Sequence, residues 1–360
     1  MKKLLPLLAW CLMLCGCGDY RELDSRDIVA GMAVDRTDDG YSLLLEIADV
    51  TAGSDDNPGA RWLGLQGTSL AAAIENGAGG TGRQAYLGHT QMVIVGDETA
   101  RSGIDDLLGY FQRTADVHMT LAMAVADGEA AEVYRQNEDE THAAFDLARA
   151  AVQAGKTGLA PAMPLYRFVA DRLDEGVEGI LPCVTQTDAG AHVTGAALFR
   201  GDVLAGRLDG ELTQTLLMAR GLLDRGVLTV GGGEDAVSFD IRSCSVDLKA
   251  GGQPDQIEAQ YTISLTLELS QSGQEGELSA ERRKAYEQLA ARTVEERFQT
   301  LCMELQNNYR VDSLGVGRQI HRRHPVLWAQ VGPDWGSAFS DCRITAQVDA
   351  ALLGGGRSLE

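Results

Sequence analysis

The sequence predicts an α+β protein with two to three mixed α/β domains, whose mainly antiparallel sheets are covered by helices. Runs with a two-residue apolar period, typical of strands, are mixed with runs in which apolar residues recur every three or four positions, typical of helices. The two kinds neither alternate regularly nor form separate groups, which favours α+β over a doubly wound sheet. The length of 360 residues suits two or three domains, and the 42 glycines imply many tight turns.

The first seventeen residues have the pattern of an export signal. Two lysines precede an apolar run of about eleven residues, which is too short for a transmembrane helix because such a helix needs about 20. The run ends in Leu-Cys-Gly-Cys at 14–17, which matches a lipobox. We therefore expect residues 1–16 to be removed and Cys17 to carry diacylglycerol, a durable two-chain anchor. The alternative is a plain signal peptide that happens to contain cysteines.

The charge of the chain excludes some partners. The formal net charge is −21, so the protein should be repelled by nucleic acid and by anionic headgroups. The lipid, and not a basic patch, must then provide the anchor. Four cysteines remain outside the signal, and their wide spacing matches no zinc or redox motif. Export permits disulfides, but buried thiols are also common in large domains. These cysteines are Cys183, Cys244, Cys302 and Cys342.

An N-terminal domain is expected over residues 28–190, after a polar tether at 17–27. Strand-like runs at 28–35 and 41–50 are joined by an Asp-Gly turn, which predicts a β-hairpin. Thr68-Ser69 is the expected N-cap of a short helix that runs through Asn76 and ends before the glycine cluster at 77–82. The other expected elements of this half are strands at 86–95 and 118–126 and helices at 104–113 and 141–153.

The expected boundary region is 154–190, which holds three prolines and several glycines, with one or two helical turns expected at 165–173. A C-terminal domain is expected over 191–353. Its expected elements are a hairpin of strands 192–200 and 203–208, a helix at 212–223, strands at 237–248, 261–269 and 344–350, a long helix at 279–307, and a loose tail at 354–360.

Two elements of the second half have the clearest patterns. Between Tyr261 and Leu269 apolar residues alternate with polar ones, which predicts a half-buried strand with one wet face. Ser279 is expected to cap the longest helix, whose apolar stripe is wide enough to cover a sheet.

The motif search yields no complete chemical site. Residues 35–46 resemble a calcium-binding EF-hand loop, but this loop joins two strand-like runs, so a hairpin turn explains it better. His321 and His324 are spaced for a shared metal on a helix, yet no further ligand lies near them in the sequence. The chain has neither a nucleophile elbow nor a zinc-protease motif. We therefore expect no metal, no cofactor and no catalytic residue, although residues alone leave a spatially assembled site and the function open.

Several stretches carry a resemblance to a known family. They are Cys17 to Leu23 with Ile28 to Asp35, His89 to Glu98 with Gly103-Ile104 and Leu107-Leu108, and Leu314 to Pro325 with Trp328 and Trp335. In this order they resemble the C-subunit lipoproteins of spore nutrient germinant receptors, the GerAC-type family. That family usually has Trp-Asp after its lipid-bearing cysteine, and Gly18-Asp19-Tyr20 departs from this pattern.

The resemblance implies a non-catalytic subunit on the outer face of the spore inner membrane. It would work with an A subunit and an integral-membrane B subunit to convert nutrient binding into germination. It also implies mixed α/β domains, with an N-terminal half that can contain two subdomains, and acylation of Cys17. Two alternatives remain, namely a lipid-anchored protein that itself binds a small molecule and, less favoured, an envelope hydrolase.

One block of the sequence looks like a family signature. An architectural role would use its glycines for a tight approach and would use its arginine and histidines to cap backbone groups. The other hypothesis is that the block contacts another subunit. Its residues are Gly315, Gly317, Arg318, His321, Pro325 and Trp328.

Overall fold

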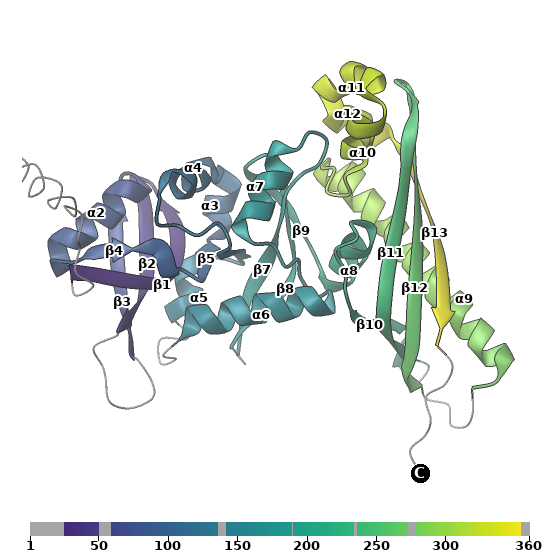
Figure 1. The fold of residues 1–360 in the computed structure, drawn as a ribbon, viewed down its shortest axis with the longest axis horizontal. Coiled ribbons are helices and arrows are strands. Elements are labelled where there is room, and N and C mark those ends of the chain that lie inside the picture. The colour runs from purple at the N-terminus through teal and green to yellow at the C-terminus, as the bar shows by residue number, and fades with distance from the viewer. Residues whose placement is uncertain are drawn as a thin grey trace, which may run out of the picture.

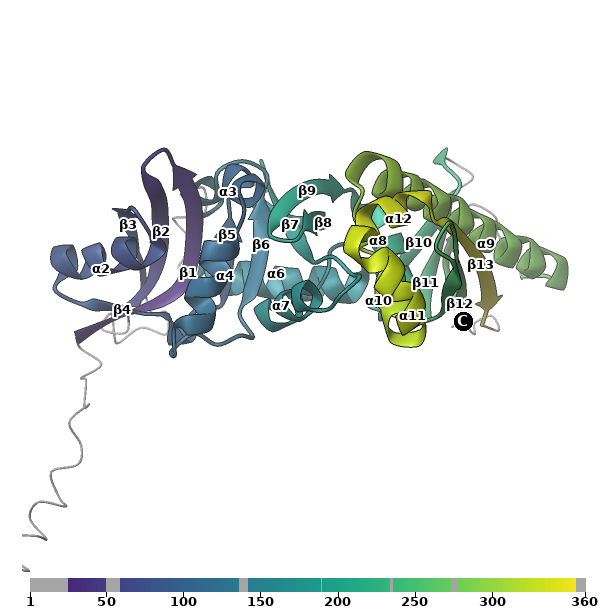
Figure 2. The same cartoon turned by 90° about the horizontal axis from the view of Figure 1, so that it is seen from above.

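The structure is a computed structural model that describes residues 25–49, 59–135, 142–188, 190–233, 236–272 and 278–353. The molecule is elongated, with one sheet in each half and the helix α8 between the two sheets (Figures 1 and 2). The predicted α+β class is therefore confirmed. Cys17, the tether and the tail at 354–360 lie outside the described residues.

The first sheet has the strand order β3-β2-β1-β5-β6-β7-β8-β9, and β4 pairs with β1. Its centre, from β1 through β7, is parallel, whereas the pairs on both flanks are antiparallel. The strands are β1 (Arg26–Thr37), β2 (Gly40–Asp49), β3 (Gly59–Gly67), β4 (Gln84–Tyr86), β5 (Met92–Val95), β6 (Ala122–Ala126), β7 (Ile180–Thr187), β8 (Gly190–Arg200) and β9 (Val203–Leu208).

Helices cover both faces of this sheet. Two of them, α5 (Ala130–Arg135) and α6 (Ala143–Thr157), pack on one face over an alanine-rich core. The other face holds the larger apolar core, which continues into the second half. The remaining helices of the half are α2 (Leu70–Thr81), the 3-10 turn η2 (Leu87–His89), α3 (Asp97–Ser102), α4 (Asp105–Arg113) and α7 (Leu165–Leu173).

The β1–β2 hairpin is confirmed, and it assigns a structural role to two acids of the calcium-like motif. The carboxylate of Asp35 accepts hydrogen bonds from the N–H groups of Ala130 and Ala131, at the start of α5. Glu46, which is buried, accepts one from the N–H of Ala144 at the start of α6. The two carboxylates thus satisfy backbone donors that a helix start leaves unpaired.

Ser69 caps α2 as predicted, since its hydroxyl accepts a hydrogen bond from the N–H of Ala72 at 3.1 Å. The expected stop at the glycine cluster is wrong, because the helix continues to Thr81 and ends at Gly82 in the left-handed conformation. Gly77 lies inside the helix, where a Cβ would come within 3.0 Å of Leu65 on β3. Close packing on the sheet therefore explains this glycine.

The strand expected over 86–95 is two strands separated by η2. Both β4 and β5 pair in parallel with β1, one at Arg26–Ile28 and the other at Gly31–Val34, and the turn carries the chain between these registers. The strand expected from His118 begins only at Ala122, because a turn joins the N–H of Leu121 to the carbonyl of His118. These boundaries depend on pairing partners that are distant in sequence.

The second sheet has the order β10-β11-β12-β13, and only its last pair is parallel. The elements of this half are α8 (Gly210–Ala219), β10 (Gly226–Val230), β11 (Val237–Gln253), β12 (Gln256–Ser272), α9 (Ala280–Met303), the π-helical turn η4 (Glu304–Tyr309), α10 (Val316–Arg323), α11 (Pro325–Val331), the 3-10 turn η5 (Gly332–Asp334), α12 (Trp335–Asp341) and β13 (Arg343–Leu352).

The helix α9 is capped by Ser279 and covers one face of the second sheet, as its stripe predicts. On the covered face Tyr261 is fully buried, and its ring packs against Phe298 with centroids 5.1 Å apart. Side chains of α9 also reach the backbone at both sheet edges. Arg297 donates to the carbonyl of Thr229 on β10, and Glu295 accepts from the N–H of Val348 on β13. These contacts satisfy edge groups that could otherwise pair with another strand.

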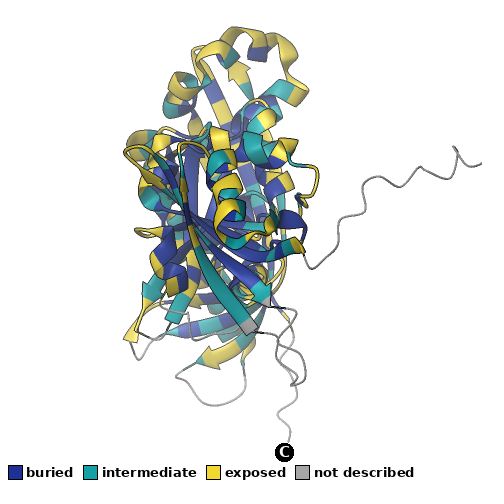
Figure 3. Cartoon of the chain, turned by 90° about the vertical axis from the view of Figure 1, so that its left-hand side faces the viewer, coloured by how far each residue is buried: buried dark blue, intermediate teal, exposed yellow. Residues whose placement is uncertain are grey.

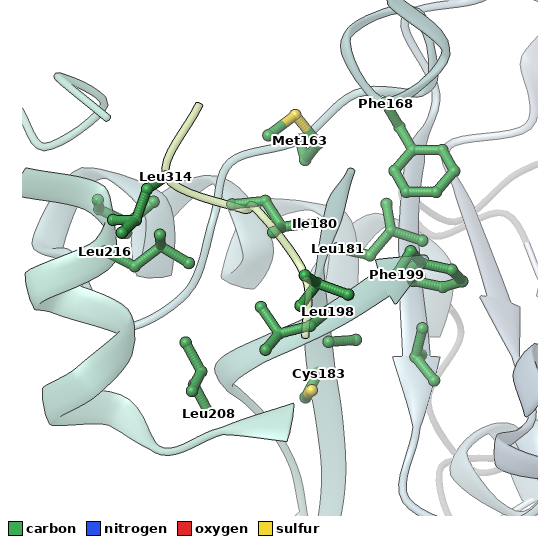
Figure 4. Packing of buried hydrophobic residues seen from close by; sticks show 14 of the residues in the cluster. Met163, Phe168, Ile180, Leu181, Cys183, Leu198, Phe199, Leu208, Leu216 and Leu314 are labelled. Atoms are coloured by element: carbon green, nitrogen blue, oxygen red, sulfur yellow. The ribbon is translucent and has the colours of Figure 1, made fainter. Parts of the chain in front are cut away.

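The hairpin β8–β9 pairs with β7, so the first sheet continues past residue 190 to Leu208. Apolar side chains from both halves then form one continuous core, in which Leu216 of α8 and Leu314 lie near Ile180 and Leu198 (Figure 4). Buried residues follow the strands through the interior (Figure 3). The two halves therefore share packed apolar surface.

The four described cysteines are free. Cys183, Cys302 and Cys342 are buried, and Cys244 is half-buried. Burial raises the pKa of Cys183 and Cys244 to about 11 and that of Cys302 and Cys342 to about 12. They are therefore protonated thiols at neutral pH, which are poor nucleophiles.

Candidate functional site

The residues of the signature block lie where the two halves of the chain meet. The loop that follows α7 in the first half contacts α10 and α11 of the second half through backbone, charged and aromatic groups. We call this region the interdomain junction, defined by residues 171–178 on one side and 312–335 on the other.

The centre of the interdomain junction is Asp312, whose side chain is buried. One carboxylate oxygen accepts hydrogen bonds from the N–H groups of Gly315 and Val316 at 2.7 and 3.2 Å. The other accepts from the N–H of Gly317 at 2.7 Å and from Nε1 of Trp335 at 3.0 Å. The carboxylate therefore satisfies the backbone donors at the start of α10. Burial raises the pKa of Asp312, although these hydrogen bonds act in the opposite direction.

Two glycines allow the halves to approach at backbone distance. Gly176 has a φ of +77°, which favours glycine. A Cβ on Gly317 would lie 2.6 Å from the ring of Trp335 and 2.8 Å from Cα of Gly176. The N–H of Arg318 donates to the carbonyl of Gly176 at 2.6 Å. The N–H of Glu178 donates to the carbonyl of Asp312 at 2.9 Å. A larger residue at either glycine would separate these backbones.

A cluster of ion pairs surrounds the backbone contact. Asp171 of α7 accepts hydrogen bonds from Arg220, at 2.7 Å, and from Arg318, at 3.4 Å. Asp174 pairs with Arg322 at 2.6 Å. Only 3% of the Arg220 side chain is exposed, so loss of Asp171 would leave a buried charge without its partner. Burial lowers the pKa of Arg318, and the neighbouring charge of Arg220 acts in the same direction.

Aromatic side chains form the third layer of contacts. Nε1 of Trp328 donates to Glu175 at 2.6 Å, across the interdomain junction. The ring of Trp328 packs between those of His321 and Trp335, with both centroid distances at 5.4 Å. His321 lies 3.8 Å from Glu175. These rings hold α10, α11 and α12 together on the loop of the first half.

Five of the six signature residues take part in the contacts of the interdomain junction described above. The glycines make a tight approach, as an architectural role would require, whereas Arg318 contacts carboxylates and not the backbone groups that we expected. Pro325 is exposed and begins α11, a position where its missing N–H costs nothing. Cys17 lies outside the described residues.

Sequence reasoning missed Asp312 and the acidic partners Asp171, Asp174 and Glu175. A signal for the pairing was present. Two acids lie at the end of α7, with Asp171 in its last turn and Asp174 at its C-cap, and Arg318 and Arg322 lie four apart on one face of α10. About 150 residues separate the two pairs, so the sequence alone could not match them.

The interdomain junction borders an open groove of about 1120 Å³. We call it the junction groove. Its lining comes from the loop after α7, the β8–β9 turn and the segment from α11 to α12. Within the described ranges, no group of three or more His, Cys, Asp or Glu side chains is placed to hold a metal ion. In the same part of the chain, no helix has the length and hydropathy needed to cross a bilayer.

Comparison with known protein families gives a match for each half. Residues 19–186 match the family described as "Spore germination protein N-terminal domain", and residues 194–356 match "Spore germination B3/ GerAC like, C-terminal". The two matches meet near the turn between β7 and β8.

Individual relatives give a consistent result. The chain is 21% identical over 357 residues to "Spore germination protein B3" of Bacillus subtilis (strain 168), which covers 95% of this chain and 94% of that one. It is 24% identical over 236 residues, 60% of each chain, to "Putative spore germination protein YfkR" of the same organism. The fold is similar to that in "Crystal Structure of the GerBC protein", with a TM-score of 0.59 and 18% identity over 93% of this chain and all of that one.

Proposed function

Because the chain belongs to the GerAC family of spore germination proteins, the C subunits of germinant receptors, we propose that it is a lipid-anchored, non-catalytic receptor subunit. It acts in germination through contacts with membrane A and B subunits. The observation that carries this proposal is the match of both halves to the family, in the family's order, over nearly the whole chain.

The proposed location is the outer face of the spore inner membrane, with Cys17 as the attachment point. The lipobox at 14–17 supports the acylation. Arg26, the first residue of β1, is nine positions after Cys17, so the tether reaches at most about 30 Å. The first half is therefore held near the bilayer. Confinement to one membrane face raises the effective concentration of the protein near its membrane partners, so that contacts of modest affinity suffice for assembly.

The interdomain junction supports a role as a rigid assembly partner. The carboxylates of Asp171, Glu175 and Asp312 and the two indole N–H groups are occupied by contacts within the chain, and these contacts fix one half against the other. Two halves held in one arrangement present a defined surface to other subunits. This preorganisation lowers the entropic cost of binding.

The test is recovery of the protein from detergent-solubilised spore membranes, with Cys17→Ala compared with wild type. Cys15→Ala is the matched control, since it removes the neighbouring thiol and leaves the acceptor cysteine in place. We expect wild type and the control to carry diacylglycerol by mass spectrometry and to recover two polytopic membrane proteins. The Cys17 variant should lose the lipid and weaken germination.

Three outcomes would contradict the proposal. The first is an unmodified Cys17, and the second is a protein found in the cytosol. The third is a stable monomer that binds amino acids or sugars by itself, which would favour the small-molecule-binding alternative.

A further inference from the structure

The junction groove is more open to solvent than a typical small-molecule site and lies at the upper end of the size range of such sites. Such sites are mostly apolar enclosures of about 300–1,000 Å³. The groove measures about 1120 Å³, is open to solvent, and has one wall from each half of the chain. A shape of this kind suits a segment of another protein.

The charges that line the groove are unequal. Six carboxylates and three guanidinium groups contribute to its walls. Two of the guanidinium groups already have partners, since Arg172 pairs with Asp105 and Arg200 donates to the carbonyl of Tyr309. Four of the carboxylates are engaged as well, namely those of Asp174, Glu175, Glu178 and Asp312. The carboxylates of Asp334 and Asp341 are exposed and take part in no ion pair or hydrogen bond within the described part of the chain. The groove therefore carries a net negative field at neutral pH.

The accessible aromatic surface of the lining comes from Trp335, which is half-buried and whose N–H is bound to Asp312, so its ring is held in place. Trp328 also borders the groove, but only 9% of it is exposed because its ring packs against His321 and Trp335. Rigid aromatic surface beside carboxylates matches lysine and arginine, which lay their alkyl stems on apolar surface and direct their charge to acids.

We propose that the junction groove binds a basic segment, containing lysine or arginine, of a membrane subunit of the receptor. This inference rests on the proposed function and names the surface that such a subunit would contact. Charge complementarity selects the occupant, because the groove is acidic and the chain as a whole has a net charge of −21. A second copy of this acidic chain would be repelled. One segment that touches both walls would bridge the two halves.

Site-specific photo-cross-linking in intact spore membranes tests the location. A benzophenone amino acid replaces Ser337, an exposed residue of the groove, in the full lipid-bearing chain. The control places the same group at Asp38, in the exposed β1–β2 turn. We expect a cross-link from position 337, and none from 38, to a peptide of a membrane protein that contains lysine or arginine. A cross-link from 337 to a second copy of this chain, or to no protein, overturns the proposal.

Charge reversal tests the chemistry. The double variant Asp334→Lys/Asp341→Lys should recover about tenfold less membrane partner than wild type at physiological salt, since like charges would then face each other. The matched control, Asp38→Lys/Asp39→Lys, makes the same change of net charge on an exposed turn and should recover the wild-type amount. Equal circular dichroism and unfolding midpoints establish that both variants fold.

The outcomes separate this inference from the function on which it rests. If wild type recovers membrane subunits and the groove variant recovers as much, the inference is refuted and the receptor role stands. If wild type recovers no membrane protein at all, the receptor role itself is refuted. If position 337 forms no cross-link to a protein and the groove instead binds a free amino acid or peptide, the groove is a ligand site of another class and the proposal is wrong.

Discussion

Substitution of Gly317 by alanine tests how closely the two halves pack. The new Cβ would lie 2.6 Å from the Trp335 ring and 2.8 Å from Cα of Gly176, whereas ordinary contacts begin near 3.4 Å. Neither neighbour can yield easily. The indole of Trp335 is bound to Asp312, and Gly176 is backbone that receives a hydrogen bond from Arg318.

The size of the effect follows from two opposing contributions. Overpacking of a constrained site costs about 2–3 kcal/mol. Alanine within a helix gains about 1 kcal/mol over glycine, and Gly317 lies in α10. We therefore expect a net loss of about 1–2 kcal/mol in the free energy of unfolding.

Gly336→Ala is the matched control. This glycine lies in α12, it is exposed, and a Cβ there would meet no atom within 4 Å. The free energy of unfolding of the control should rise by up to about 1 kcal/mol. The free energies of unfolding of the two variants should therefore differ by about 2–3 kcal/mol. Denaturant unfolding followed by tryptophan fluorescence measures this, because Trp328 and Trp335 both lie at the interdomain junction. If Gly317→Ala is as stable as Gly336→Ala, the close approach is refuted.

Three further predictions concern charges and thiols. Asp171→Ala should cost about 3–5 kcal/mol in the free energy of unfolding because it leaves Arg220 buried and unpaired, whereas Asp146→Ala, which breaks an exposed pair with Arg149, should cost less than about 1 kcal/mol. Burial raises the pKa of Asp97, but hydrogen bonds from Arg101 and Arg207 outweigh it and hold the pKa below its usual value. The stability that wild type gains over Asp97→Asn should therefore be present at neutral pH and disappear as pH falls below about 4, as pH-dependent unfolding would show. The four described thiols should resist iodoacetamide at pH 8 in the native protein, and all four should react after unfolding without reductant, by mass spectrometry.

Each of these three predictions has its own contrary result. Equal losses for Asp171→Ala and Asp146→Ala would mean that the ion pairs of the interdomain junction are solvated like surface pairs. A difference in the free energy of unfolding between wild type and Asp97→Asn that stays constant from pH 7 to pH 3 would show that Arg101 and Arg207 do not lower the pKa of Asp97. Fewer than four labelled cysteines after unfolding without reductant would reveal a disulfide.

The fold was predictable where the pattern is local. The β1–β2 hairpin has an Asp-Gly turn, α2 has Ser69 as its cap, and β12 has a strict two-residue alternation. Each signal acts within a few residues, so no knowledge of the remainder of the chain is needed. The strands β3 and β7 were missed because neighbouring strands, and not their own sequence, determine them.

The lipobox pattern, the acidity of the chain, the main strands and helices, and the family resemblance could all be read from contiguous residues. The pairing of acids with arginines, and the contact of Asp312 with the start of α10, became visible in the folded chain. The tertiary structure also decided that Gly176 and Gly317 let two backbones touch across the interdomain junction. The physical reason is distance along the chain. Partners some 150 residues apart are brought together by packing of the two sheets and their helices, and no local preference encodes that pairing.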